Sequence, residues 1–80
     1  MRIVKEILHP SCKITIFQWN GKYLIKLEQG NIEQTFKVDE IDVNTPAELE
    51  SIINKKFIDE ALKRFREMNE SLYKATKDLY

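Results

Sequence analysis

His9 and Cys12 are the only histidine and the only cysteine of the chain, and three positions separate them. Zinc accepts imidazole nitrogen and thiolate ligands, so this pair could supply half of a metal site. Two ligands are too few for a closed zinc site, and a second subunit would have to complete it. We therefore interpret His9 as a loop residue and Cys12 as a buried, small apolar side chain, and we expect no metal and no cofactor.

A second group of potential ligands is Glu40, Asp42 and Asn44, which alternate like the oxygen ligands that open a calcium loop. That motif needs glycine at its sixth position and glutamate at its twelfth, where this chain has Thr45 and Ser51. The segment is better interpreted as an acidic connection that leads into a helix N-terminus, where negative charge is favourable.

Catalytic patterns are missing from the sequence. No serine or cysteine has a plausible base nearby in sequence, and two glycines are too few for a phosphate-binding loop. Carboxylate pairs such as Asp59 and Glu60 fall on the exposed side of a predicted helix. We expect that the chain is not an enzyme.

The strongest structural signal is Asn20-Gly21 between two alternating apolar runs, which predicts a β-hairpin over residues 12–29 with a type I′ turn. A two-residue turn places Phe17 opposite Leu24. Period-two alternation then gives one apolar face, made of Cys12, Ile14, Ile16, Tyr23, Ile25 and Leu27. The other face is mixed, and carries Lys13, Thr15, Phe17 and Trp19 against Lys22, Leu24, Lys26 and Glu28.

The hairpin continues into a larger sheet. Gly30-Asn31 predicts a second turn, after which residues 32–38 return as a strand, with Phe36 opposite Ile25 and Glu33 opposite Glu28. Residues 2–8 are short, β-branched and alternating, and either Ile3 and Ile7 or Val4 and Leu8 could face inward. We interpret residues 2–8 as a first strand, and we predict an antiparallel meander of three or four elements, with three strands as the preferred number.

The C-terminal half predicts two helices. Thr45-Pro46-Ala47-Glu48 is a capping box with proline at the first helical position. The apolar phase is interrupted at residues 54–56, and a longer pattern follows in which Ile58, Phe65, Leu72 and Leu79 are seven apart. A helix over residues 56–79 would be about 36 Å long, whereas strands of this length span about 25 Å. The helix should extend past the sheet.

These elements predict a single α+β domain over residues 1–80, with a β-meander in 1–38 and a helical region in 45–80. The long helix should pack on the sheet face that carries Ile14, Ile16, Ile25, Leu27 and Phe36. An extension that bears apolar side chains, Tyr73 and Tyr80 needs a partner, and a twofold homodimer is the economical one, although another protein could also serve. The predicted interface residues are Phe65, Met68, Leu72, Ala75, Leu79, Phe17, Trp19 and Leu24.

An alternative hypothesis is a single-stranded nucleic-acid binder that uses the mixed sheet face through Lys13, Phe17, Trp19, Lys22, Lys26 and Lys37. The chain holds 13 basic and 13 acidic residues, so it has no net positive charge to draw it to nucleic acid or to an anionic membrane. No apolar run approaches the roughly 18 residues of a membrane span, and the N-terminus lacks the apolar region of a signal peptide. A single cysteine fits a reducing compartment, and we expect a cytoplasmic protein.

Three stretches, HPSCKITIF at residues 9–17, WNGKY at 19–23 and EQTFK at 33–37, resemble a family of short uncharacterised bacterial proteins. The resemblance covers most of the chain. It implies a small free-standing protein and carries no activity and no functional residue.

Overall fold

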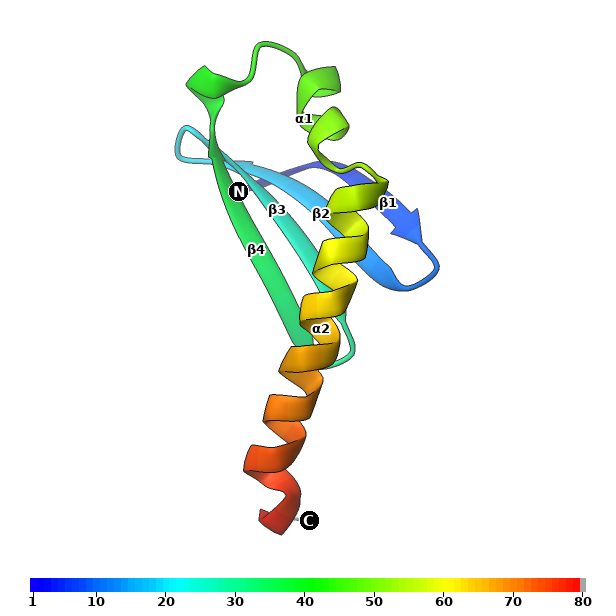
Figure 1. Cartoon of the computed structure of the whole chain (residues 1–80). Coiled ribbons are helices and arrows are strands. Elements are labelled where there is room, and N and C mark those ends of the chain that lie inside the picture. The colour runs from blue at the N-terminus through cyan, green and yellow to red at the C-terminus, as the bar shows by residue number, and fades with distance from the viewer. Residues whose placement is uncertain (80) are drawn as a thin grey trace.

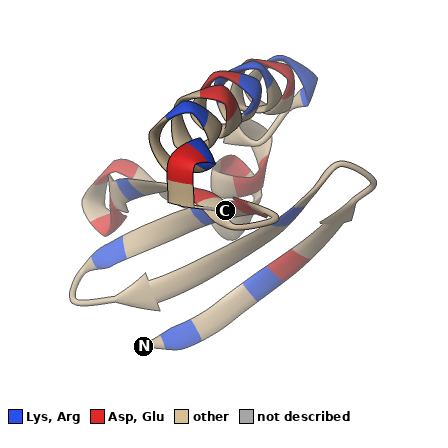
Figure 2. Ribbon diagram, turned by 90° about the horizontal axis from the view of Figure 1, so that it is seen from below, with Lys and Arg blue, Asp and Glu red and all other residues tan. Residues whose placement is uncertain are grey.

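The computed structural model describes residues 1–79, and it consists of a four-stranded sheet followed by two helices (Figure 1). The strands are β1 (Arg2–His9), β2 (Cys12–Trp19), β3 (Lys22–Gln29) and β4 (Ile32–Asp39), and they form an antiparallel sheet in the order β1-β2-β3-β4. A 3₁₀ turn, η1 (Glu40–Asp42), leads to α1 (Pro46–Ile52) and α2 (Lys55–Thr76), and a second 3₁₀ turn, η2 (Lys77–Leu79), follows. Both helices lie on one side of the sheet, and the other side is uncovered (Figure 2).

The α+β class, the antiparallel sheet and the long C-terminal helix are confirmed, but the predicted number of three strands is wrong. The N-terminal segment is a full edge strand, β1, paired with β2 from Arg2 to His9. Its register shifts between Ile3 and Lys5, and this irregularity explains why the inward face could not be chosen by alternation. Val4 and Ile7 both pack against the core, while Ile3 is 56% exposed.

The predicted registers of both later hairpins are confirmed. Asn20 and Gly21 have φ values of 52° and 74°, the left-handed pair that a type I′ turn requires. The like-charged pair Glu28 and Glu33 is indeed opposed across β3 and β4. Lys26 offsets this repulsion, because its Nζ lies 3.0 Å from the Glu33 carboxylate and 3.8 Å from that of Glu28.

The core lies between the helices and the predicted apolar sheet face. Its largest fully buried side chains are Ile14, Ile16, Ile25 and Leu27 from the sheet, Leu49 from α1 and Phe65 from α2. Gln34 is the polar member of this layer. Its Nε2 donates to the carbonyl oxygen of Ala61 at 2.9 Å, and its Oε1 accepts from Arg64 Nε at 2.8 Å. Both ends of the buried amide are therefore satisfied, and they tie α2 to β4.

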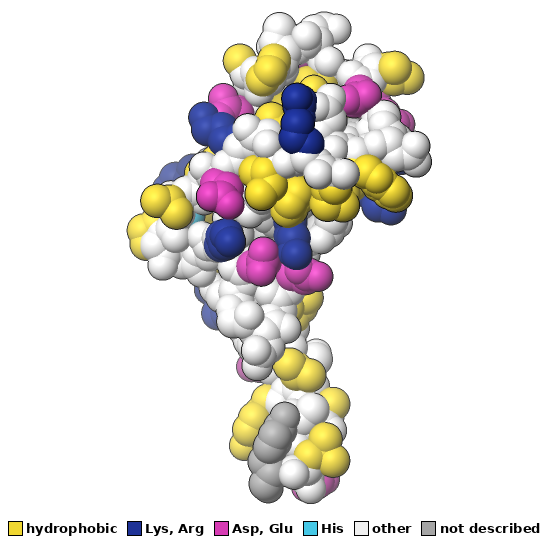
Figure 3. All heavy atoms as spheres, turned by 180° about the vertical axis from the view of Figure 1, so that it is seen from behind, with side chains coloured by type: hydrophobic (Ala, Val, Ile, Leu, Met, Phe, Trp, Pro, Cys, Tyr) yellow, Lys and Arg dark blue, Asp and Glu magenta, His cyan; other side chains and the backbone are white. Residues whose placement is uncertain are grey.

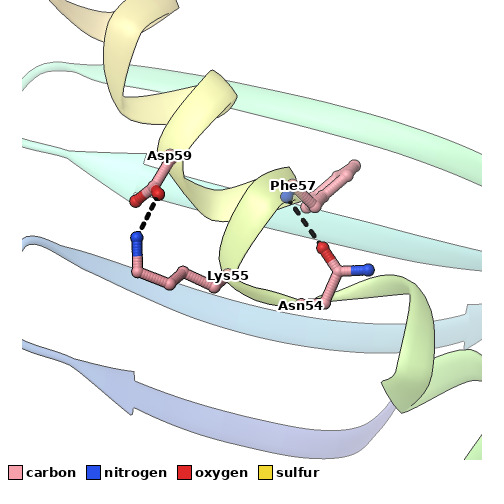
Figure 4. Close-up of polar contacts among 4 residues, drawn as sticks. All are labelled: Asn54, Lys55, Phe57 and Asp59. Atoms are coloured by element: carbon pink, nitrogen blue, oxygen red, sulfur yellow. Dashed lines mark hydrogen bonds and ion pairs between the residues drawn. The ribbon is translucent and has the colours of Figure 1, made fainter.

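Each of the two helices begins at its own N-cap residue. The Thr45 hydroxyl accepts from the amide of Glu48 at 3.2 Å and starts α1. The side chain of Asn54 accepts from the amide of Phe57 at 2.9 Å and starts α2 (Figure 4). The interruption near Asn54 is therefore a true break, and its cause is a new cap rather than a kink.

The helix α2 extends beyond the sheet at the end where the β3–β4 turn lies (Figure 1). Its 22 residues span about 33 Å, against about 26 Å for the eight residues of each strand. The Asn69 side chain still reaches Gln29 at the end of β3, at 3.5 Å. The molecule is consequently elongated, with extents of 47 × 26 × 19 Å.

Candidate interaction surfaces

Residues 70–79, which we call the helix extension, carry apolar side chains away from the sheet. Leu72 is 44% exposed, Tyr73 69% and Leu79 77%, and Ala75 is exposed beside them. Figure 3 shows hydrophobic side chains on this part of the molecule. Tyr80 falls outside the described residues.

Two of the predicted interface residues on α2 belong to the core instead. Phe65 is fully buried against the sheet of its own chain, and Met68 packs partly buried against the same core. Phe65 is therefore removed from the set of interface candidates. The seven-residue spacing placed it on the correct side of the helix, but the sheet of the same chain already covers it.

The uncovered side of the sheet, which we call the open face, is organised in rows by the strand register. One row crosses the sheet as Ile3, Phe17, Leu24 and Lys37. The next rows are Glu6, Thr15, Lys26 and Thr35, then Leu8, Lys13, Glu28 and Glu33, and beyond the first row stand Trp19, Lys22 and Asp39. The open face is thus most apolar around Phe17 and Leu24, with the Lys22–Asp39 ion pair beyond them at the β2–β3 turn, and mainly charged near the opposite end.

The apolar end of the open face is partly hollow. Met1, Phe17 and Leu24 line a shallow depression of about 200 Å³ together with Lys26, Glu33 and Thr35. Phe17 and Leu24 are half-buried, whereas Trp19 is 52% exposed. Figure 3 shows hydrophobic side chains gathered across the upper part of this face, with acidic and basic side chains below them.

The charges of the open face balance. Four lysines, Lys13, Lys22, Lys26 and Lys37, share it with four carboxylates, those of Glu6, Glu28, Glu33 and Asp39. Lys22 forms an ion pair with Asp39, and Lys26 bridges the two glutamates. The hydrogen bond that Lys26 donates to the Glu33 carboxylate and the nearby charge of Glu28 raise the pKa of Lys26 above its ordinary value. Two of the four lysines proposed for nucleic-acid binding are thus already paired with carboxylates.

The two candidate metal ligands face each other across β1 and β2. The His9 Nδ1 accepts from the amide of Ser11 at 3.1 Å, which closes the turn between these strands. Cys12 is 7% exposed, and burial raises the pKa of its thiol. Within residues 1–79 no three histidine, cysteine, aspartate or glutamate side chains come together closely enough to hold a metal ion.

The acidic connection has a local structural role. Glu40 accepts a hydrogen bond from the Gln18 side chain, and its amide donates to the carbonyl oxygen of Gly21 at 3.0 Å. These contacts attach η1 to the β2–β3 turn. On α2, Asp59 lies on the exposed side and pairs with Lys55 at 2.6 Å (Figure 4).

Sequence reasoning missed Met1 and Ile3 as members of the apolar end of the open face. The signal was the ambiguous alternation of the first strand, which the register shift explains.

No family model, no curated protein and no solved structure matches the chain. Among residues 1–79 no helix is both long and apolar enough to cross a membrane.

Proposed function

We propose that this chain is a small, non-catalytic cytoplasmic interaction module that self-associates through the helix extension. The observation that carries the proposal is the apolar side of α2 continuing past the end of the sheet. Leu72 follows Phe65 by seven residues, which is close to two helical turns, so it points to the same side as Phe65 but beyond the sheet that buries it. Leu79, in the 3₁₀ turn that follows α2, adds a second exposed leucine to the extension.

A second copy can fill this space. In a twofold arrangement two extensions lie antiparallel, and each one occupies the layer that the other chain's sheet leaves empty. Burying Leu72 and Leu79 in this way gains roughly 1.5–3 kcal/mol for each leucine that becomes fully buried. The extension also carries Lys74 and Asp78, charges of opposite sign that an antiparallel neighbour can pair.

The test is the solution mass by light scattering over a dilution series, for the unchanged chain and for Leu72→Asp. We expect the unchanged chain to exceed its monomer mass of 9.5 kDa, and Leu72→Asp to weaken association because a carboxylate cannot be buried unpaired. Ser71→Asp is the matched control, since it adds the same charge to an exposed neighbouring position. A Leu72→Asp chain that keeps its circular dichroism spectrum and its full mass would exclude this interface.

The nucleic-acid alternative differs from this proposal in its response to salt. Phosphate contacts release counterions, so affinity for a single strand should fall steeply as salt is added. Self-association through apolar side chains should change little. The balanced charge of the open face supports self-association, and absence of oligonucleotide binding at low salt would remove the alternative.

A further inference from the structure

We propose that the open face is a second self-association surface, which packs against the open face of another copy about a twofold axis parallel to the β2–β3 hairpin. The inference rests on the proposed self-association of the chain, but it concerns a different surface. Each copy offers the same patch, as a twofold interface requires.

The hairpin register makes this surface complementary to itself. An axis between β2 and β3 places the β2 strand of each copy over the β3 strand of the other. Each cross-strand pair of the hairpin then recurs between the copies. Phe17 of one copy faces Leu24 of the other, and Lys13 faces Glu28, because these residues are partners in the register.

The remaining β2–β3 pairs fit the same axis. Trp19 of one copy faces Lys22 of the other, which suits a cation and an aromatic ring. Lys26, the long side chain near the centre, lies over the small Thr15, which its own chain already buries to 3% exposure. In the central hairpin Phe17 thus lies on Leu24 at one end and opposite charges meet at the other. At the two edges β1 lies over β4, so Ile3 faces Lys37 and Leu8 faces Glu33.

Charge and area both favour a second copy as the occupant. The open face carries four lysines and four carboxylates, so two such faces do not repel each other, whereas an anionic partner needs a positive surplus. Four strands of eight residues give a face of roughly 500 Å². Two of them bury roughly 1,000 Å² in total, near the lower limit for a specific interface. The association should therefore be weak and depend on concentration.

The test uses two charge reversals that complement each other. Lys13→Glu leaves two carboxylates at the 13/28 pair of each copy, and Glu28→Lys leaves two ammonium groups there, so each variant alone repels itself at both charged contacts. Mixed in equal amounts, the two variants pair opposite charges at both contacts. We expect each variant alone to associate about tenfold more weakly than the Leu72→Asp chain in which it is made, and the mixture to regain most of that affinity.

Both variants are made in the Leu72→Asp background, where light scattering reports the open face without the helix extension. Lys63→Glu is the control, because it makes the same charge change at an exposed position on α2. Recovery on mixing supports the open-face interface, since a folding defect in either chain would not be repaired by the other. Unchanged mass in the single variants, or no recovery in the mixture, would overturn it.

The two interfaces can fail separately. If the Leu72→Asp chain has the mass of a dimer and the charge reversals abolish it, the open face is an interface whatever the role of the extension. If Leu72→Asp is already monomeric at every concentration, the open-face proposal is wrong and the extension alone accounts for association.

Discussion

At the scale of single residues, Cys12 links burial to a measurable response to pH. Burial raises the pKa of its thiol above the ordinary value of 9.0. The folded chain therefore holds the proton at pH values where the unfolded chain has lost it, and folding stability falls as the pH rises through this range.

We expect the urea midpoint of the unchanged chain to fall between pH 9.0 and pH 10.5, and that of Cys12→Ala to fall less. Above pH 10.5 both chains should lose further stability, because Lys26 and Lys55 also have raised pKa values. The comparison is between slopes, so the small cavity that alanine leaves does not affect it. Parallel slopes for the two chains below pH 10.5 would show that the thiol proton plays no part.

Lys26 explains why the β3–β4 register is stable although it places two glutamates opposite each other. The opposed Glu28 and Glu33 argue against that pairing when they are considered as a pair alone. The third residue changes the balance, because Lys26 lies within 4 Å of both carboxylates. The pattern of apolar positions, which aligned Ile25 with Phe36, was the better guide to the register.

At the scale of elements, the break between α1 and α2 depends on one side chain. Asn54→Ala removes the acceptor for the amide of Phe57, and we expect it to lower the free energy of unfolding by about 1 kcal/mol. Asn54→Ser keeps a capping oxygen and should lose little. Urea unfolding of the three chains measures both differences, and equal loss in the two variants would show that the cap is not what matters.

The elements that were predictable are those whose causes are local. Asn20-Gly21 fixes the central hairpin through two positive φ angles, and Thr45 fixes a helix start through one hydrogen bond. The register shift in β1 and the burial of Phe65 were not predictable in this way. Both depend on where one element lies against another, and a seven-residue pattern is the same whether or not a sheet covers it.

The same limit applies to the candidate surfaces. Phe17, Trp19 and Leu24 could be assigned to one side of the hairpin because side chains alternate along a strand. Ile3 and Met1 join them only because the edge strand shifts its register. The Lys22–Asp39 ion pair was not predicted, because the predicted strand ended at residue 38, whereas β4 extends the expected register by one more position to Asp39.

At the scale of the whole molecule, the elongated shape predicts a gradient of local stability. The core holds β2, β3 and the first part of α2 through fully buried side chains, whereas the helix extension has exposed apolar residues and no sheet beneath it (Figure 1).

In dilute solution the amides of residues 70–76 should exchange with solvent much faster than those of β2 and β3. Raising the protein concentration should slow exchange in the extension, because a second copy then covers Leu72. Amide exchange at two concentrations, read by mass spectrometry on peptides, measures this directly, and Leu72→Asp should abolish the concentration effect while Ser71→Asp keeps it. If exchange in the extension were equally slow at both concentrations and in Leu72→Asp, its order would come from the chain itself, and the exposed leucines would need no partner.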